Sequence, residues 1–220
     1  AWIDTLAGLM EEKKIYIADG LHRLDVSFKL NLSYMPMYLT NMYSRGIVIL
    51  PYHRTIKFGK DRALHNILST IEDYADIEKK PLKDDNSAKS AFDDIASSQK
   101  PAFVLYSKDD VSHLYVLREK KACPMESNLH KSLAKLKVNI LHAGILNGLL
   151  NIKDEEISYT QDAYKSINLV KRKDIDLALF LPPTTVEEVK DIADNGLYMP
   201  PKSTFFHPKI LTGLVFYRYQ

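Results

Sequence analysis

The sequence predicts an α+β fold in which helices flank a mixed sheet, and two observations favour this class. Segments with apolar residues at helical spacing alternate along the chain with short apolar runs that end at turn residues. At 220 residues with 45% hydrophobic side chains, the chain can bury a substantial core. We expect one domain over residues 1–220, and its abrupt start suggests the C-terminal part of a longer polypeptide.

The first predicted elements lead into the most informative stretch of the chain. Apolar residues from Trp2 to Met10 recur at helical spacing, so residues 2–13 are expected to form an amphipathic helix. Residues 15–18 form a short apolar run, and we expect a buried strand there that ends at Asp19. The polar residues that follow this strand are therefore candidates for a site.

The turn at Asp19 and Gly20 is the first candidate site. Gly20 can adopt a positive φ angle without a Cβ clash, so the chain can reverse tightly and start a helix. The first N–H groups of a helix have no intrahelical acceptor, and together with the helix dipole they favour an anion. The sequence therefore predicts an anion or phosphate site at this turn.

The helix after the turn is expected to have an apolar face and a polar face. Leu21, Leu24 and Phe28 fall at spacings of three and four, whereas His22 and Arg23 point away from them. Burial of the apolar face would present the polar pair to a cleft. The alternative is equally compatible with these residues alone: the carboxylate caps the helix, the glycine only turns the chain, and both cationic side chains are solvated.

Two strands are predicted next, over residues 35–42 and 46–56, in what could be a hairpin. Pro51 interrupts the second of them, which indicates an edge strand or a bulge. His53 and Arg54 repeat the His-Arg pair at the end of a strand. They would belong to the site if they faced the turn at Gly20, and otherwise they are the charged tips of an exposed edge.

The rest of the chain alternates between the two kinds of element. The segment 128–151 is expected to be core helix, in which His142 is more simply a core histidine than a ligand. A helix is expected to open at 159–162 with Thr160 as its cap. The other expected helices cover 61–74, 87–98 and 186–193, and the other expected strands cover 102–106, 113–118, 177–181 and 211–219.

Residues 199–209 form the second candidate site. This stretch contains three prolines, two lysines and two hydroxyl side chains, and it contains no acid. The run of Lys202, Ser203 and Thr204 resembles the end of a P-loop, but the glycines that would cradle a phosphate are absent. The prolines predict a stiff loop that holds Lys202 and Lys209 in place. The alternative is a rigid surface loop that packs its two phenylalanines.

The net charge of +2 argues against a protein built mainly to coat nucleic acid. Its distribution is uneven, because residues 26–60 and 196–220 contain lysine and arginine but no acid. If the fold brings these stretches together, they create a field that attracts anions. If it does not, they are solvated cations.

The remaining sequence features indicate a cytoplasmic protein. The single cysteine, Cys123, cannot form an internal disulfide, and no basic segment followed by an apolar run opens the chain. The most apolar stretch, residues 140–150, is too short to span a bilayer. Zinc-type cysteine pairs, His-Glu metal motifs, dinucleotide glycine fingerprints and serine elbows are absent from the sequence.

Four blocks resemble a known family, the one catalogued as domain of unknown function 1015. They are Ile-Ala-Asp-Gly-Leu-His-Arg at 17–23, Ile-Leu-Pro-Tyr-His-Arg at 49–54, Leu-Pro-Pro-Thr-Thr-Val at 181–186, and Met-Pro-Pro-Lys-Ser-Thr-Phe-Phe-His-Pro-Lys at 199–209. The resemblance runs in order over essentially the whole chain. Family members are typically about twice as long, so this chain resembles their C-terminal half.

The first block carries a more distant resemblance. Its Asp-Gly-x-His-Arg pattern is similar to the phosphate-binding turn of the sulfiredoxin, ParB and free serine kinase superfamily. By this resemblance Gly20, His22 and Arg23 would hold nucleotide phosphates, and Asp19 would orient the pair or assist a metal. Leu21 stands where the family usually has histidine and sulfiredoxin has its reactive cysteine, which excludes sulfiredoxin chemistry. If the family has a catalytic carboxylate in the half that is absent here, this chain would bind its substrate without converting it.

Together these observations predict a nucleotide- or phosphate-binding domain of a small-molecule phosphotransferase, with a nucleoside triphosphate or diphosphate and Mg²⁺ as cofactors. The geometric hypothesis is that the turn at Gly20 and the proline-rich tail meet, with Arg23 and Lys202 around one anion. Whether the chain itself is an enzyme stays open. The expected catalytic residues are Asp19 and His22, and the expected binding residues are Gly20, Arg23, His53, Arg54, Lys202, Ser203, Thr204 and Lys209.

Two other functions compete with this one. A non-enzymatic ParB-like module would bind nucleic acid or a protein partner with steep salt dependence, although the small net charge makes nucleic acid a less favoured partner than a small molecule or nucleotide. A structural half-protein would use its basic loops to contact the absent segment. No membrane partner is expected, and the sequence does not indicate the oligomeric state.

Overall fold

The computed structural model describes residues 2–60, 62–211 and 213. The chain divides into two compact units. One unit, here called the turn unit, contains Ala1–Ile47 and Pro208–Gln220, and the other, here called the sheet unit, contains Val48–His207. The predicted strand over 211–219 lies almost entirely outside the described residues.

The sheet unit is built on a six-stranded sheet with the order β3-β5-β4-β7-β2-β6, and each pairing is antiparallel. The α+β class with helices flanking a sheet is therefore confirmed. The strands are β2 (His53–Ile56), β3 (Ala75–Pro81), β4 (Ala102–Ser107), β5 (Asp110–Glu119), β6 (Ile157–Thr160) and β7 (Leu177–Phe180).

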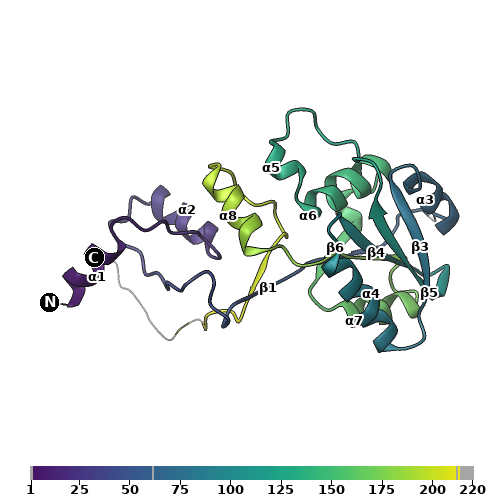
Figure 1. The fold of residues 1–220 in the computed structure, drawn as a ribbon, viewed down its shortest axis with the longest axis horizontal. Coiled ribbons are helices and arrows are strands. Elements are labelled where there is room, and N and C mark those ends of the chain that lie inside the picture. The colour runs from purple at the N-terminus through teal and green to yellow at the C-terminus, as the bar shows by residue number, and fades with distance from the viewer. Residues whose placement is uncertain (1, 61, 212, 214–220) are drawn as a thin grey trace. The chain divides into compact units, whose positions relative to one another are not determined.

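Helices cover both faces of this sheet (Figure 1). Successive side chains of a strand point to opposite faces, so β4 and β7 contribute to two separate buried clusters. Helices α4 (Asp85–Ser97) and α7 (Ala163–Lys171) pack against one face. Helix α3 (Leu64–Ile71) and the π-helix η1 (Ile140–Leu149) pack against the other face.

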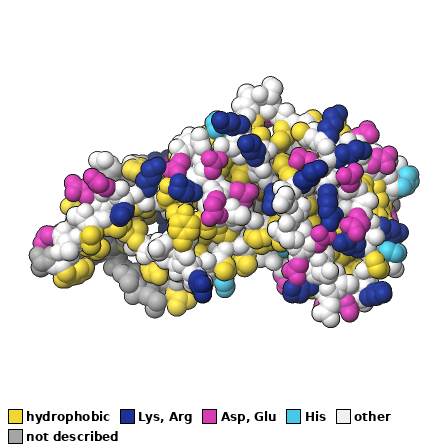
Figure 2. Space-filling view, in the orientation of Figure 1, with side chains coloured by type: hydrophobic (Ala, Val, Ile, Leu, Met, Phe, Trp, Pro, Cys, Tyr) yellow, Lys and Arg dark blue, Asp and Glu magenta, His cyan; other side chains and the backbone are white. Residues whose placement is uncertain are grey.

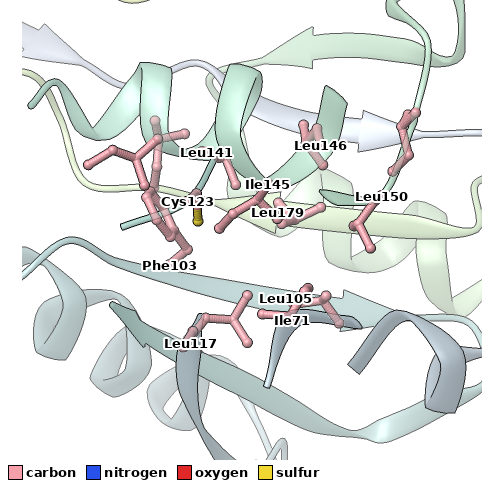
Figure 3. Packing of buried hydrophobic residues seen from close by; sticks show 14 of the residues in the cluster. Ile71, Phe103, Leu105, Leu117, Cys123, Leu141, Ile145, Leu146, Leu150 and Leu179 are labelled. Carbon is pink, nitrogen blue, oxygen red and sulfur yellow. The ribbon is translucent and has the colours of Figure 1, made fainter. Parts of the chain in front are cut away.

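The π-helix η1 supplies much of the larger cluster (Figure 3). Its wide turns are visible in the bond from the Leu150 N–H to the Ile145 carbonyl, which spans five residues at 2.9 Å. Gly144 lets the helix approach Cys123, because a Cβ at residue 144 would lie 2.8 Å from the Cys123 Cβ. Burial raises the pKa of the Cys123 thiol to about 11, so this cysteine is inert packing.

The predicted core helix over 128–151 is wrong as one continuous helix. The structure divides it into α5 (Lys131–Ala134), α6 (Lys137–Asn139) and η1. Leu136 breaks the run, because its backbone is extended at φ −63° and ψ 125°. The short helix η2 (Asp154–Glu156) then leads into β6.

A second sheet has two strands, β1 (Val48–Leu50) and β8 (Phe205–His207), which pair antiparallel. Val48 lies opposite His207, so the chain enters and leaves the sheet unit at adjacent residues. The predicted hairpin between strands at 35–42 and 46–56 is wrong. Residues 35–42 contain no strand, and Pro51, which has no N–H to donate, separates β1 from β2.

The helix predicted over 186–193 is present, and the helix predicted to open at 159–162 begins later. Helix α8 (Val186–Asp194) begins at a Thr185 capping box and is followed by Gly196 at φ +69°. The helix expected to open at 159–162 instead starts at Ala163, and Asp162 caps it by accepting from the Lys165 N–H at 2.9 Å.

The turn unit contains the helices α1 (Trp2–Met10) and α2 (Leu21–Lys29). Ser27 is the only buried residue among its described positions from 2 to 47, and hydrophobic side chains reach its surface (Figure 2). The predicted buried strand over 15–18 is wrong. Ile15 and Ile17 are 52% and 49% exposed, and no described neighbouring strand pairs with this segment.

Candidate functional site

The turn at Gly20 has the predicted backbone geometry. Helix α2 begins directly after Gly20, whose φ of +84° and ψ of 20° lie in the left-handed region. A Cβ at this position would also lie 2.8 Å from Nη2 and 3.0 Å from Nε of Arg23. Glycine is therefore favoured by the left-handed backbone, and a side chain at this position would also displace the Arg23 guanidinium that folds back over it.

The start of α2 leaves backbone donors available to a ligand. The Leu24 N–H donates to the Gly20 carbonyl at 3.0 Å, so the N–H groups of Leu21, His22 and Arg23 precede the first helical bond. No side chain accepts from them as an N-cap. The Arg23 guanidinium is beside these donors, and together they form a positive end of the helix.

Asp19 connects the turn to the C-terminal tail. Its Oδ1 accepts from the Gly20 N–H at 2.9 Å, and its Oδ2 lies 3.2 Å from Nζ of Lys209. Partial burial would raise the pKa of Asp19, but the hydrogen bonds from Lys209 and Gly20 outweigh it and hold the pKa below its ordinary value. Lys209, 190 positions further along the chain, is thus brought to the predicted turn.

The expected burial of the apolar face of α2 is wrong. Leu21 and Phe28 are 45% and 74% exposed, and the buried residue of this helix is Ser27, whose hydroxyl donates to the Leu24 carbonyl. His22 is exposed on the first turn. The turn itself, and not a buried apolar stripe, positions the cationic pair in this unit.

The sheet unit contains a second group of predicted residues, around Arg54. The Arg54 side chain is 1% exposed, its Nη1 donates to the Tyr52 carbonyl, and its Nη2 donates to the Lys202 carbonyl at 3.4 Å. The Tyr159 ring lies 5.3 Å from the Arg54 Cζ, which is a cation-π distance. Burial lowers the pKa of Arg54 to about 10, and the group remains protonated at neutral pH.

The segment from Lys202 to Thr204 is held against this arginine. Lys202 has a φ of +55°, and its ammonium lies 5.6 Å over the Tyr52 ring. Ser203 is buried, and its carbonyl accepts from the Thr184 hydroxyl at 3.0 Å. Thr204 is half-buried and leads into β8. These contacts hold the loop in place, as the sequence predicted.

His53 does not share a site with Arg54, because adjacent residues of β2 point to opposite faces of the sheet. Its ring lies 5.2 Å from the Phe180 ring and 6.4 Å from the Phe92 ring. Burial, with a smaller contribution from Arg54, lowers the pKa of His53 to about 4. His53 is therefore neutral at pH 7 and does not supply a positive charge to an anion.

Sequence reasoning missed three residues around Arg54. Tyr52 and Tyr159 were not singled out, and His142 was interpreted as a core histidine. The His142 Nε2 lies 3.2 Å from Oδ1 of Asp154, and its ring lies 6.5 Å from the Tyr159 ring. The signal that could have found Tyr159 is its position opposite Arg54 in the β2–β6 register, which no single segment of sequence contains.

The structure thus gathers the predicted residues in two groups. Asp19, Gly20, Arg23 and Lys209 form one group in the turn unit. Arg54, Lys202 and Ser203 form the other in the sheet unit, and His53 lies on the opposite face of that sheet.

Neither group contains a ready-made metal site. No cluster of three or more His, Cys, Asp or Glu side chains suited to a metal ion occurs among the described residues. Both carboxylate oxygens of Asp19 already accept hydrogen bonds. A Mg²⁺ ion at this turn would therefore need most of its oxygen ligands from phosphates and water.

The described part of the chain contains no helix that is both long enough and apolar enough to cross a membrane. On the face drawn in Figure 2, acidic and basic side chains are interspersed over the sheet unit.

Comparisons with known proteins give the chain its family. Similar solved structures include a conserved hypothetical protein from Pyrococcus furiosus, with 16% identity, a TM-score of 0.48 and coverage of 86% of this chain and 68% of that chain. A variant of a free serine kinase, solved in complex with AMP and with ADP, matches at 15% and 16% identity, with TM-scores of 0.49 and 0.48 and coverage of 86% of this chain and 66% of that chain.

The chain therefore spans about two thirds of the length of these similar structures. A comparison with curated proteins found no match. The model of the family described as protein of unknown function (DUF1015) matches residues 1–139, which is more than half of the chain. On this match, the chain belongs to the DUF1015 family of proteins of unknown function.

Proposed function

We propose that the turn at Gly20 binds the phosphates of a nucleotide, as part of a small-molecule phosphotransferase. The observation that carries this proposal is the start of α2, where free backbone donors, the folded-back Arg23 guanidinium and the Lys209 ammonium converge around Gly20 and Asp19. The choice of a nucleotide rests on the resemblance of the Asp-Gly-x-His-Arg block to a nucleotide phosphate-binding turn.

The residues present suit this chemistry. Phosphoryl transfer depends mainly on positioning the phosphate and neutralising its charge, and it needs little covalent help from the protein. Arg23 can grip phosphate oxygens with two parallel N–H groups, whereas Lys209 acts as a point charge. Asp19 holds Lys209 at the turn and shields the Gly20 N–H. His22 is exposed beside them and is the group available to exchange a proton with a bound substrate.

The nucleotide would bring Mg²⁺ with it. Since Asp19 is a single carboxylate with both oxygens engaged, phosphate oxygens and water would supply most ligands of the ion. The ion would reduce the phosphate charge that Arg23 and Lys209 must neutralise.

Calorimetric titration of the chain with ATP, ADP and AMP, each with and without Mg²⁺, tests this function. Wild type should bind at least one of them, and Arg23→Ala should weaken that binding by about tenfold or more, since a charge-assisted contact contributes about 1.5–3 kcal/mol. Arg45→Ala is the matched control, because Arg45 is an exposed arginine of the same unit outside the turn.

Equal binding by the Arg23→Ala and Arg45→Ala variants would contradict the proposed site. Absence of binding to all three nucleotides would contradict the proposed function. If the chain instead bound an oligonucleotide with an affinity that fell steeply with salt, the nucleic-acid module would replace the phosphotransferase as the better account.

A further inference from the structure

The sheet unit contains a buried positive charge that no described acidic side chain neutralises. Arg54 lies on β2, a strand with neighbours on both sides, and is 1% exposed. No carboxylate lies within ion-pair distance of it among the described residues, since none of their ion pairs includes Arg54. An unpaired buried charge costs several kcal/mol, so a native structure normally supplies a counter-charge.

The donors of Arg54 are also only partly used. Nη1 and Nη2 donate to the carbonyls of Tyr52 and Lys202, and the second of these bonds is long, at 3.4 Å. The Nε atom is buried and has no acceptor among the described residues. A guanidinium has five N–H groups, and each buried donor without an acceptor costs about 1–3 kcal/mol.

Lys202, whose backbone contacts Arg54, carries a second positive charge on an exposed side chain. Its carbonyl accepts from Arg54, and its ammonium lies over the ring of Tyr52, the residue whose carbonyl also accepts from Arg54. Lys202 forms no ion pair in the described part of the chain. Its φ of +55° is uncommon for a residue with a side chain, and the Thr184 bond to the Ser203 carbonyl helps to hold this backbone.

Arg62 shows what the same contacts look like in an ordinary structural arginine. Its guanidinium donates to the carbonyls of Leu150 and Asn151 and lies 5.3 Å over the Phe58 ring. Arg62 is only half-buried, so its remaining donors can reach water, and its Nε is not left unsatisfied. What distinguishes Arg54 is full burial with a donor that has no described acceptor, and a backbone contact with a lysine that forms no described ion pair.

We propose that Arg54 and Lys202 form a second anion site, separate from the turn at Gly20, and that its ligand is the phosphate group of a small molecule. A dianionic phosphate balances the two unpaired positive charges, whereas a carboxylate balances only one. One phosphate oxygen accepts from the Arg54 Nε and another from the Lys202 ammonium. The long hydrogen bond from the Arg54 Nη2 to the Lys202 carbonyl breaks when the ligand binds.

His142 provides a reporter for this site. Its Nε2 lies 3.2 Å from the exposed carboxylate of Asp154, and its Nδ1 is buried without a partner among the described residues. Burial and, after it, the charge of Arg54 lower the pKa of His142, while Asp154 opposes them. A phosphate that neutralises Arg54 removes one of the lowering contributions, so the pKa of His142 must rise when the ligand binds.

The test measures the pKa of His142 by NMR of its ring while inorganic phosphate is added to the full chain. The His142→Gln variant identifies which ring signal belongs to His142. In wild type, saturating phosphate should raise the pKa of His142, and acetate should bind at least about tenfold more weakly. Lys202→Ala changes an exposed side chain and is expected to fold, and it should weaken phosphate binding about tenfold. Arg54→Lys should do the same or more, because the single ammonium of lysine lacks the planar fork of five donors.

Two controls make the result specific. Arg62→Met removes an arginine with matching contacts and should leave phosphate binding unchanged. Arg23→Ala should leave the phosphate-induced rise in the pKa of His142 unchanged, because this readout reports on the surroundings of Arg54 and not on the turn at Gly20, so this site can fail or survive independently of the nucleotide site. The proposal is overturned if phosphate leaves the pKa of His142 unmoved, if Lys202→Ala binds phosphate as wild type does, if acetate binds equally well, or if Arg23→Ala abolishes the effect.

Discussion

At the scale of single residues, conformation and charge select the candidate sites. Position 20 favours glycine because its backbone is left-handed and the Arg23 side chain lies over it. Arg54 is confined to its position by two carbonyls and an aromatic ring. In both places a described polar group keeps unused hydrogen-bonding capacity, which makes it available to a ligand.

Replacement of Gly20 by alanine should affect both the fold of the turn and its ligand. An alanine here would have an unfavourable positive φ, so we expect the free energy of unfolding to fall by about 1–2 kcal/mol. Its Cβ would displace the Arg23 guanidinium, so we also expect weaker nucleotide binding. Urea denaturation and calorimetric titration measure the two effects. Gly46→Ala is the control, because its Cβ would meet only Ser44 Oγ at 3.5 Å, and it should change neither quantity.

At the scale of elements, periodicity predicted helices well and strands unevenly. Helices α3, α4 and α8 and the β4–β5 hairpin were predicted close to their observed positions, because their apolar spacing is regular and their ends carry turn or cap residues. Strand β3 was missed because it is an edge strand of the sequence Ala-Asp-Ile-Glu-Lys-Lys-Pro, whose charges discourage further pairing and hide the strand pattern.

The candidate site likewise has parts that the local sequence predicted and parts that it could not predict. The reversal at Gly20 and the start of α2 follow from local residue chemistry, so the sequence predicted them. The Asp19–Lys209 contact was predicted only as a hypothesis that the tail meets the turn, since 190 positions separate the partners. The surroundings of Arg54 come from three separate segments, and no local pattern contains the information that Tyr159 and His142 lie near it.

The π-helix η1 should tolerate little extra volume. In Gly144→Ala the new methyl group would lie 2.8 Å from the Cys123 Cβ, within the larger buried cluster, so the free energy of unfolding should fall by about 1–3 kcal/mol. Urea denaturation of Gly8→Ala is the comparison. That glycine is also helical but has open space around it, and alanine there should be neutral or stabilising by up to about 1 kcal/mol. Equal destabilisation by both changes would contradict the packing described for η1.

At the scale of the whole molecule, burial is concentrated in one unit. Both buried clusters lie within the sheet unit, whereas the described residues 2–47 of the turn unit bury only Ser27. Apolar side chains on α1, such as Trp2 at 73% and Leu9 at 66% exposure, contribute little to stability in this state. Stability should therefore differ strongly between the units.

Hydrogen exchange followed by mass spectrometry tests this difference. Backbone amides of the central strands β4 and β7 should exchange slowest, because opening them requires disruption of both clusters. Amides of α1 and α2 should exchange faster by at least about a hundredfold. Comparable protection in α1 and β4 would show that the turn unit is held by contacts beyond those described.

The short ladder between β1 and β8 has a consequence for the turn at Gly20. A contact between residues 190 positions apart would ordinarily carry a large entropy cost of loop closure, and one exposed ion pair could not offset it. Because Val48 and His207 are direct partners, the segments that carry Asp19 and Lys209 diverge from a common stem. We therefore expect these three residue pairs to raise the effective concentration of Lys209 at Asp19. A proline introduced at Phe206 should disturb the ladder and weaken binding of the proposed nucleotide, although Phe206 itself is not a proposed ligand contact.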